Sequence, residues 1–201
     1  MAAIVVPFRG SGGKSRLRRL LPEARARLTL AMLGDVLAAA TAVSRTLVVT
    51  RDESALAVAQ EVGAEVVDDP GGGQGAAVAA ALGTLPTDGV VVCNADVPCV
   101  RPYDLRTLAA STPPGGIALV PSADGRTNAL SLPAPHIFQP LYGARSAERF
   151  RAAAGEVGLE ALSLSIPNLV DDVDTDEDLR RVGGRAGPRT RAALAGVEVA
   201  T

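Results

Sequence analysis

The sequence predicts an α/β protein with a mainly parallel central sheet, helices on both faces of that sheet and a mixed portion in its second half. Short runs of β-branched residues alternate with longer helical patterns along the chain, which is the order that a parallel sheet requires. With 201 residues, 47% of them hydrophobic, the chain is long enough to bury one sizeable core and short for two. We therefore expect a single domain.

The expected elements follow from two hydrophobic periodicities. Apolar residues spaced for one helix face follow Pro22, and proline suits the first turn of a helix. The run from Gly89 to Asn94 is apolar up to its last residue, as in a central parallel strand. The expected strands are 4–7, 46–50, 64–67, 89–94, 117–120, 129–132 and 161–166. The expected helices are 22–40, 54–62, 76–82, 102–110 and 146–157, with a further candidate at 189–194.

A glycine-rich basic loop follows the first strand. Gly10, Gly12 and Gly13 let the backbone approach an anion closely, and its N–H groups, together with the start of the following helix, can hold a phosphate. Lys14 is the only lysine among 20 Lys and Arg residues, which indicates that this position needs a compact point charge. The loop is not a Walker A motif, because Phe8 stands where that motif has glycine. A solvated loop lysine is the alternative.

Two further loops begin at expected strand ends. The glycine run 71–75 follows the strand at 64–67, where Gly72, Gly73 and Gly75 would allow a base or ribose to approach the backbone. A flexible connection is the alternative. Asp96 follows the strand at 89–94 and is expected at the carboxyl edge of the sheet, where open α/β sheets bind ligands.

The second half of the chain offers two more candidate binding positions. Thr127 and Asn128 end a polar turn between two expected strands, where both side chains would be exposed to a substrate. Ser146 is a good N-cap for the helix expected at 146–157, so Gly143 and Ser146 would form a second anion site at that helix start. A plain helix cap is the alternative for this pair.

An acidic cluster begins at Asp171, and its carboxylates fall into two groups. Thr175 and Asp178 resemble a capping box in which Asp replaces Glu. The acids at 176–178 are therefore expected in the first turn of a helix, where the helix dipole stabilises them without any catalytic role.

Asp172 and Asp174 precede that cap in an extended stretch. Alternate residues of an extended chain share a side, so these two carboxylates can converge. Together with Asp96 they would form a hard oxygen site that suits Mg²⁺.

The composition argues against several kinds of partner. A net charge of −2, a sequence pI of about 5.5 and an aromatic content of 2% disfavour nucleic acid. The apolar runs are interrupted before the roughly 20 residues of a membrane span, and the start of the chain has no signal-peptide layout. We therefore expect no membrane partner and a cytoplasmic location. Cys93, Cys99 and the single His136 are too few for a zinc site, so both cysteines are expected to be ordinary small apolar residues.

Six motifs together resemble the 2-phospho-L-lactate / phosphoenolpyruvate guanylyltransferases of coenzyme F-420 biosynthesis. They are Lys14-Ser15-Arg16-Leu17, the glycine run 71–75, Ala95-Asp96-Val97-Pro98, Thr127-Asn128-Ala129-Leu130, Gly143-x-x-Ser146 and Asp172-Val173-Asp174-Thr175-x-Glu177-Asp178-Leu179. The resemblance covers roughly residues 3 to 182 and implies a single-domain, Rossmann-like nucleotide-diphospho-sugar transferase fold of the glycosyltransferase-A-like kind. We accordingly expect a nucleotidyltransferase domain over 1–182 and a C-terminal tail over 183–201 with one short helix.

The activity that the resemblance implies is transfer of GMP from GTP to phosphoenolpyruvate or 2-phospho-L-lactate, with release of pyrophosphate. Phosphoenolpyruvate is the expected acceptor, because the composition is typical of actinobacterial members. Lys14, Arg16 and Asp96 are the implied catalytic residues, and Mg²⁺ on Asp96, Asp172 and Asp174 is the implied cofactor. A downstream transferase that takes the unstable product is the implied protein partner.

The same resemblance implies two sets of binding residues. The nucleotide-binding residues would be Gly10, Gly12, Gly13, Lys14, Gly72, Gly73, Gly75 and Asp96, with Arg16 neutralising the triphosphate. The residues that hold the carboxylate and phosphate of the three-carbon acid would be Thr127, Asn128, Gly143 and Ser146.

The chain departs from the family pattern at three places. Val97 replaces a more common leucine, Arg126 replaces glycine, and Ala144 with Arg145 replaces Pro-Gly, which changes the expected shape of the acid-substrate pocket. Two other functions remain open. One is a molybdopterin guanylyltransferase-like enzyme, whose usual N-terminal loop this chain matches poorly. The other is a non-catalytic nucleotide-binding regulator, which would not need an acidic site of this charge.

Overall fold

The computed structural model describes residues 2–86 and 88–196. The strands are β1 (Ala3–Pro7), β2 (Thr46–Val49), β3 (Glu65–Val67), β4 (Val90–Cys93), β5 (Gly116–Pro121), β6 (Thr127–Leu132) and β7 (Glu160–Ser163). The helices are α1 (Pro22–Thr41), α2 (Glu53–Val62), α3 (Gln74–Leu82), α4 (Pro102–Ala110), α5 (Ser146–Glu156), α6 (Pro167–Val170), α7 (Asp176–Val182) and α8 (Pro188–Ala195), with a 3₁₀ turn η1 (Pro135–Ile137). Within this part of the chain, no helix has both the length and the apolar character that crossing a membrane requires.

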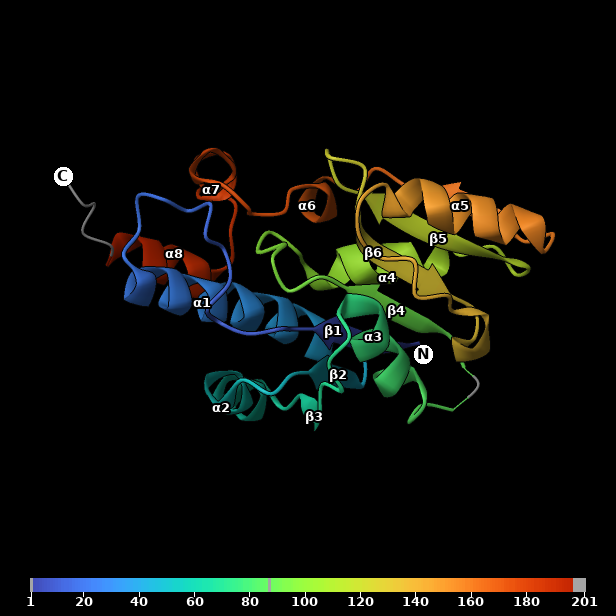
Figure 1. Ribbon diagram of the computed structural model, residues 1–201, viewed down its shortest axis with the longest axis horizontal. Helices are drawn as coiled ribbons and strands as arrows, with labels where there is room; N and C mark the ends of the chain where they lie inside the picture. Colours follow the sequence, from blue (N-terminus) through green and yellow to red (C-terminus); the bar gives the residue numbers. More distant parts are fainter. Residues whose placement is uncertain (1, 87, 197–201) are drawn as a thin grey trace.

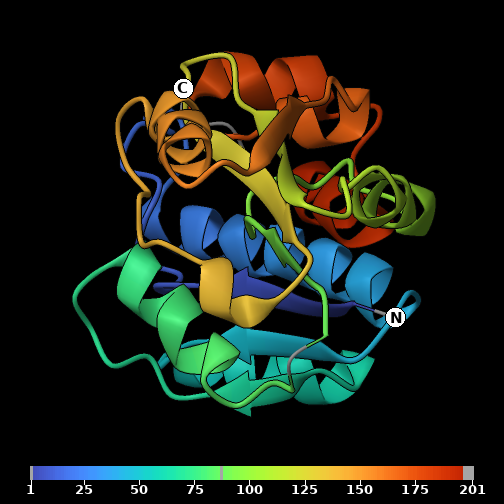
Figure 2. The same cartoon turned by 90° about the vertical axis from the view of Figure 1, so that its right-hand side faces the viewer.

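The described residues form one seven-stranded sheet in the order β3-β2-β1-β4-β6-β5-β7. β6 pairs antiparallel with β4 and β5, and every other pairing is parallel. Figures 1 and 2 show the sheet passing through the molecule with helices packed on both sides of it. The predicted α/β class, the mainly parallel sheet and its mixed second half are confirmed.

Alternation along the buried strands divides the core into two layers. In β1, Ile4 and Val6 face the layer formed with α1, α2, α4 and α6, whereas Val5 faces the layer formed with α3 and α5. In β4, Val91 and Val92 divide in the same way. The two-residue period of each strand therefore supplies both faces of the sheet with apolar side chains, as expected for a sheet covered on both sides.

The strand order places several loops at one edge of the sheet. β1 and β4 are neighbours, and the chain leaves both strands at their carboxyl ends. β6 runs the other way, so it begins at the same edge, where the Asn94 N–H donates to the carbonyl of Asn128 at 2.9 Å. The strand order reverses between β1 and β4, and such a switch point is where doubly wound sheets bind ligands.

The helix after the glycine loop begins at Pro22, as expected. Residues 8–21 form a long connection before α1. The connection is anchored by Leu17, which is fully buried against Leu28 and Met32 of α1. No residue of the first turn of α1 lines the pocket described below, so the expectation that the start of this helix helps the loop to hold a phosphate is wrong, and the loop would bind an anion through its own N–H groups and side chains.

The helix expected at 189–194 is present as α8, which packs against α1. Asp35 of α1 is buried, and its carboxylate accepts hydrogen bonds from the backbone N–H groups of Arg189 and Thr190 at 3.1 and 2.8 Å. This carboxylate satisfies N–H groups in the first turn of α8 that have no partner within the helix. Residues 197–201 of the expected tail lie outside the described residues, and the boundary after residue 182 stays a prediction.

Gly187 provides a test of this helix contact. Its φ of −64° is ordinary, but a methyl group there would overlap the Asp35 carboxylate. We expect Gly187→Ala to lower the free energy of unfolding by about 1–3 kcal/mol, the usual effect of overpacking. Urea unfolding measures this.

Gly184→Ala is the matched control in the same connection. A methyl group at Gly184 would meet no atom within 4 Å, so its effect should stay within about 0.5 kcal/mol. Equal stability of the two variants would contradict the packing of α8 described here.

Candidate active site

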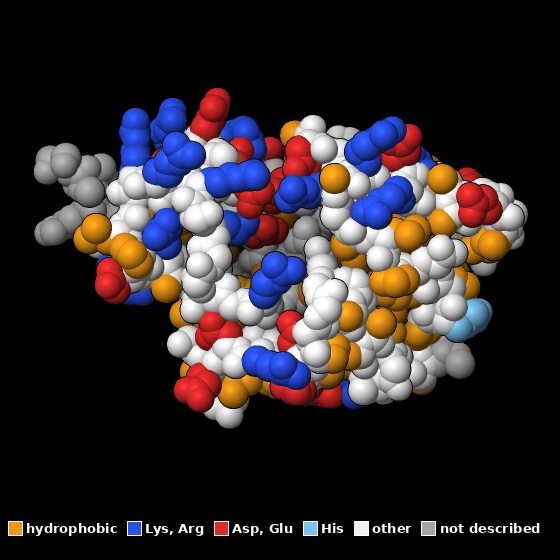
Figure 3. All heavy atoms as spheres, in the orientation of Figure 1, with side chains coloured by type: hydrophobic (Ala, Val, Ile, Leu, Met, Phe, Trp, Pro, Cys, Tyr) orange, Lys and Arg blue, Asp and Glu red, His pale blue; other side chains and the backbone are white. Residues whose placement is uncertain are grey.

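A pocket of about 320 Å³ opens at the carboxyl edge of the sheet. The loop after β1, helix α1, the start of α3 and the loop after β4 contribute its walls. The lining residues are Pro7, Phe8, Arg9, Gly10, Gly13, Lys14, Thr29, Met32, Asp69, Gly73, Gln74, Ala77, Asn94, Ala95 and Asp96. Figure 3 shows a hollow on this face with acidic side chains inside it and Lys and Arg side chains around it.

The glycine loop is fastened to the neighbouring helix α2. The N–H and the hydroxyl of Ser11 donate to Asp52 Oδ2 at 2.6 and 2.8 Å. The other oxygen of Asp52 accepts from the N–H groups of Ser54 and Ala55 and so caps α2. Burial opposes ionisation of Asp52, but the hydrogen bonds from Ser11 and the helix N–H groups outweigh it and hold the pKa of this carboxyl below its usual value. One carboxylate thus fixes both the loop and the helix.

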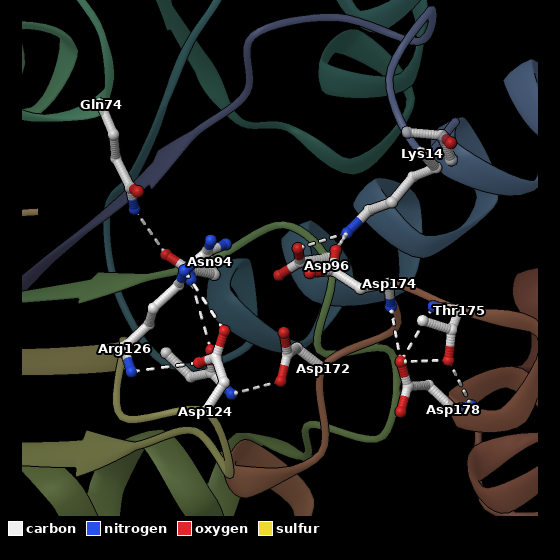
Figure 4. Close-up of polar contacts among 12 residues, drawn as sticks. Lys14, Gln74, Asn94, Asp96, Asp124, Arg126, Asp172, Asp174, Thr175 and Asp178 are labelled. Atoms are coloured by element: carbon white, nitrogen blue, oxygen red, sulfur yellow. Dashed lines mark hydrogen bonds and ion pairs between the residues drawn. The ribbon is translucent and has the colours of Figure 1, made fainter. Parts of the chain in front are cut away.

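Lys14 lies at the end of this loop and points into a group of carboxylates (Figure 4). Its Nζ is 2.6 Å from Asp96 Oδ2 and 2.6 Å from Asp174 Oδ1, and only 12% of its side chain is exposed. Burial opposes the charged form of Lys14, but the two carboxylates outweigh it and raise the pKa of the ammonium. The alternative of a solvated loop lysine is therefore wrong. Its φ of 62° is left-handed, a strained conformation for a residue with a side chain.

Three carboxylates meet beside Lys14. Asp96, Asp172 and Asp174 each offer one oxygen, and the three oxygens lie within 4.8 Å of one another. Burial, followed by the nearby Asp96 carboxylate, raises the pKa of Asp172 to about 6. The Oδ1 of Asp96 is buried and has no hydrogen-bond partner among the described residues. One ammonium cannot balance three carboxylates, so the unpaired oxygen and the remaining negative charge fit a divalent cation bound by oxygen ligands.

The backbone explains why these carboxylates converge. Val173 lies between Asp172 and Asp174 in extended chain, and its side chain is fully buried. Its N–H donates to the carbonyl of Asp96 at 3.0 Å, which places the two acidic segments side by side. Because alternate residues of an extended chain share a side, burial of Val173 directs both neighbouring carboxylates toward Asp96.

The predicted capping box at the start of α7 is present. Asp178 Oδ2 accepts from the N–H and the hydroxyl of Thr175, each at 2.8 Å, and from the N–H of Asp174 at 3.1 Å. Asp178 therefore holds the backbone of Asp174 and lies outside the carboxylate cluster. The expected structural role is therefore confirmed for Asp178, and for Asp176 and Glu177 it stays a prediction.

A chain of side-chain amides connects the pocket to the carboxylates (Figure 4). Gln74 Nε2 donates to Asn94 Oδ1 at 2.7 Å, and Asn94 Nδ2 donates to Asn128 Oδ1 at 3.4 Å. Asn128 Nδ2 in turn donates to Asp172 Oδ1 at 3.3 Å and to the carbonyl of Leu169 at 3.0 Å. Gln74 and Asn94 are absent from the predicted site, although Gln74 lies within the glycine run 71–75 and Asn94 is the last residue of the strand predicted at 89–94.

Thr127, Asn128 and Ser146 are buried, each only 1% exposed, so the expectation that the turn before β6 exposes Thr127 and Asn128 is wrong. β6 begins at Thr127, two residues earlier than expected. The hydroxyl groups of Ser146 and Thr127 are hydrogen-bonded to each other at 3.1 Å. Ser146 is the first residue of α5 and its N-cap is Arg145, so the N-cap expectation is also wrong.

The expected nucleotide-binding residues divide into two groups. Gly10, Gly13, Gly73, Lys14 and Asp96 line the pocket. The remaining glycines, Gly12, Gly72 and Gly75, are not among its lining residues. Gly75 packs against Pro140 so closely that a side chain would overlap it, and this packing explains why the position is a glycine.

Arg16 and Gly143 also lie away from this pocket. Arg16 is exposed and lines a second pocket of about 210 Å³ with Lys14, Ser15, Arg126 and Asp174. Gly143 has a φ of 115° and borders a third, open pocket in front of α5. Whether Thr127, Asn128, Gly143 and Ser146 bind the acid substrate stays a prediction.

Sequence comparisons identify relatives over nearly the whole chain. The profile of the MobA-like NTP transferase domain matches residues 12–169. A phosphoenolpyruvate guanylyltransferase of Geodermatophilus obscurus is 36% identical, with 96% of this chain and 94% of that protein covered. A phosphoenolpyruvate guanylyltransferase of Nocardia farcinica is 38% identical, with 96% and 89% covered.

Structural comparisons agree on the fold. A protein of Desulfovibrio desulfuricans G20 described as a nucleotide-diphospho-sugar transferase superposes with a TM-score of 0.79 at 17% identity, covering 97% of this chain and 95% of that one. The molybdopterin-guanine dinucleotide biosynthesis protein A of Archaeoglobus fulgidus gives a TM-score of 0.55 at 18% identity, covering 89% and 95%. At these identities the likeness concerns the fold alone. Nucleotidyltransferases of this kind usually use a divalent metal, and the carboxylate cluster could bind one.

We expect the carboxylate cluster to bind a divalent cation, with Mn²⁺ as the probe. Asp172→Asn should weaken Mn²⁺ binding, which calorimetry measures. Loss of a residue that only supports a metal ligand weakens metal binding by roughly 10–100-fold, so loss of a ligand should weaken it at least as much. The variant should not unfold more easily without metal, because it removes one of three mutually repelling charges and keeps an oxygen that can accept from Asn128.

Glu177→Gln is the matched control. Glu177 is an exposed acid in the first turn of α7, outside the cluster, so its removal should leave Mn²⁺ binding unchanged. Wild-type affinity in Asp172→Asn would reject the cation site.

Proposed function

The chain belongs to the MobA-like NTP transferase family and, within it, to the phosphoenolpyruvate guanylyltransferases, and on that premise we propose that it transfers GMP from GTP to phosphoenolpyruvate. The product would be enolpyruvoyl-diphospho-guanosine, a precursor of coenzyme F-420 that passes to a downstream transferase. Matches that extend over nearly the whole chain support this assignment, since they include both acidic segments and the glycine loop.

The observation that carries the proposal is the meeting of Lys14 with three carboxylates at the edge of the 320 Å³ pocket. If these carboxylates had only a structural role, each would be expected to have a positively charged partner, because an unpaired buried charge is costly. Here two negative charges and one buried oxygen of Asp96 remain uncompensated. Asp96, Asp172 and Asp174 would hold Mg²⁺, which when bound neutralises charge on phosphate oxygens.

The pocket suits a nucleotide in size and in chemistry. Its volume lies at the lower end of the range for small-molecule sites, and Phe8, Met32 and Ala77 provide apolar walls. The N–H groups of the glycine loop, fastened by Asp52, would face the phosphates. The amides of Gln74 and Asn94 would offer hydrogen bonds to the ribose or base.

The reaction needs no covalent intermediate with the protein. An oxygen of the phosphoenolpyruvate phosphate attacks the α-phosphorus of GTP, a new P–O bond forms, and the bond to the β-phosphate breaks with release of pyrophosphate. The protein therefore has to bring two polyanions together and stabilise their charge. Lys14 is suited to this task, because its raised pKa keeps the ammonium charged and its partners fix its position.

The two other functions receive less support. The likeness to a molybdopterin-guanine dinucleotide biosynthesis protein rests on the fold at 18% identity, whereas the phosphoenolpyruvate guanylyltransferases reach 36–38%. A non-catalytic regulator would have no use for three carboxylates held together against their repulsion.

Removal of Asp96 tests the proposed activity. The wild-type protein with GTP, phosphoenolpyruvate and Mg²⁺ should release pyrophosphate, and a chelator should stop the reaction until Mg²⁺ is restored. Asp96→Asn should lower turnover by about 10²–10³ or more, the scale for losing an electrostatic stabiliser of the transition state.

Asp88→Asn is the matched control, because Asp88 is an exposed acid just before the opposite end of β4. Its turnover should equal that of the wild type. Wild-type turnover in Asp96→Asn, or no turnover in the wild-type protein, would reject guanylyl transfer at this site.

Competition between the two candidate acids tests the acceptor. Phosphoenolpyruvate and 2-phospho-L-lactate differ only in the bond between C2 and C3, which is a double bond with planar C2 in the first and a single bond with tetrahedral C2 in the second. We expect phosphoenolpyruvate to have the higher kcat/KM, by no more than about 200-fold, because so small a steric difference supports only about 1–3 kcal/mol of discrimination. A higher kcat/KM for 2-phospho-L-lactate would reject the acceptor and leave guanylyl transfer in place.

A further inference from the structure

The basic residues of the chain are unevenly distributed. Residues 15–27 and 179–201 together contain ten of the 20 Lys and Arg residues but only two of the 22 Asp and Glu residues, Glu23 and Glu198. The first segment is the end of the connection before α1 and the start of that helix, and the second runs from the end of α7 through α8. The net charge of −2 is therefore the balance between one strongly basic part of the chain and an acidic remainder.

The described parts of these two segments, 15–27 and 179–196, lie side by side. Leu17 of the connection is buried in one cluster with Val182 of α7, and Leu20 and Leu194 pack against the same cluster. Figure 1 shows the connection, α7 and α8 at the same end of the molecule, and Figure 3 shows Lys and Arg side chains gathered over that end. We call the exposed surface of these two segments the basic face.

Some arginines of the basic face already have carboxylate partners. Three of the ten are paired, Arg181 with Asp171 and Asp178, Arg185 with Asp171, and Arg189 with Glu61. Arg16 lines the second pocket with Asp174, so it borders the carboxylate cluster and is not counted with the free charges. The remaining six arginines form no ion pair with the described residues, and all but Arg25 are exposed. They are Arg18, Arg19, Arg25, Arg27, Arg180 and Arg191.

The acids beside these six arginines do not balance them. Glu23 lies in the first turn of α1, and Asp176 and Glu177 lie in the first turn of α7. Asp35 is buried beneath α8, where backbone N–H groups of that helix donate to it. With the three acids of the helix starts set against the six arginines, the basic face keeps an excess of three positive charges.

An exposed leucine lies among these charges. Leu21 is 59% exposed and follows Arg18 and Arg19 closely in the sequence. Its carbonyl accepts from the N–H of Arg25 at 2.9 Å, so its backbone is fixed as the N-cap of α1. Protein interfaces commonly bury an apolar side chain at the centre and are enriched in arginine. Leu21 and its neighbouring arginines have this composition.

Two other classes of polyanion fit the basic face less well. Neither segment contains an aromatic residue on which a base could stack, which disfavours single-stranded nucleic acid. Membrane surfaces are bound by helices that present a broad apolar face, but Leu21 is the only large apolar side chain exposed in the described parts of these segments. Planar guanidinium groups, in contrast, bind carboxylates through paired hydrogen bonds.

We propose that the basic face binds an acidic segment of another protein, whose carboxylates pair with the free arginines and whose apolar side chain covers Leu21. This inference goes beyond nucleotidyl transfer and does not depend on it. Because Arg16 belongs to the basic face and also lines the second pocket, the bound partner would lie beside the active site.

Fluorescence anisotropy with labelled acidic peptides tests the proposal, at about 0.15 M salt, where distant exposed charges are largely screened. One peptide consists of glutamate and leucine, and a second of equal charge has serine in place of leucine. A DNA duplex and vesicles of phosphatidylglycerol and phosphatidylcholine represent the other two classes of partner. The wild-type protein should bind the leucine peptide most tightly, and about fivefold more tightly than the serine peptide, because only the former buries apolar surface against Leu21.

Two variants separate charge from apolar contact. Arg18→Ser combined with Arg19→Ser should weaken binding of both peptides by about tenfold or more, since charge-assisted hydrogen bonds are lost. Leu21→Ser should remove the difference between the peptides and keep the affinity for the serine peptide within about twofold. Both variants should fold, because the three side chains are exposed and serine is a good N-cap for α1.

Matched controls remove the same chemistry from other surfaces. Arg106→Ser combined with Arg151→Ser removes two exposed arginines from α4 and α5, and Val157→Ser removes a side chain that is 62% exposed. These controls should bind both peptides within about twofold of wild type. Equal losses in the controls and the test variants would show an unspecific effect of charge and overturn the basic face as a docking surface.

Other results would also reject the proposal. Absence of peptide binding, or equal affinity of the wild-type protein for the two peptides, would contradict an acidic partner held by Leu21. Tighter binding of the DNA duplex or of the vesicles through the same arginines would assign the face to that class instead. Unchanged peptide binding in the double arginine variant, together with a lower kcat/KM for GTP, would assign these arginines to attraction of the substrate. The binding assay needs no turnover, so its result is independent of guanylyl transfer.

Discussion

The mutual repulsion of three carboxylates is the constraint on which this active site depends. Asp96, Asp172 and Asp174 each place an oxygen within 4.8 Å of the others. Burial, followed by the like charge of Asp96, raises the pKa of Asp172. Burial of Val173 and its backbone bond to Asp96 supply the opposing force. The cluster is therefore held by the core of the protein, and a cation would find its ligands already in place.

The glycine loop supplies the positive charge that pairs with this cluster, the ammonium of Lys14, and the position of Lys14 explains the length of the loop. It has to carry Lys14 from the end of β1 to carboxylates that follow β4 and precede α7. Buried Leu17 and the Ser11–Asp52 hydrogen bonds fix the loop on either side of the lysine. A compact ammonium can contact two carboxylates at 2.6 Å in such a space, where a planar guanidinium would require a wider one. This explains why the chain keeps one lysine there among so many arginines.

Local periodicity was sufficient to predict the alternation of strands and helices and the convergence of Asp172 with Asp174, because each depends on residues close together in sequence. The errors concern contacts between distant segments. Asn128 was expected to be exposed, yet its amide donates hydrogen bonds to α6 and to Asp172, about 40 residues further along the chain. Gln74 and Asn94 were missed because their pairing exists only once α3 is packed beside the end of β4. No local pattern carries that information.

The distribution of charge over the molecule agrees with two anionic substrates. The chain as a whole has a net charge of −2, so it gains no general attraction for GTP or phosphoenolpyruvate. The attraction has to be local, and Arg9 in the lining of the nucleotide pocket would contribute to it. The carboxylates of the cluster would by themselves repel both substrates. A divalent cation beside Lys14 would reverse this effect. The carboxylate oxygens repel phosphate when no cation is bound, but they would hold a bound cation, whose positive charge attracts phosphate.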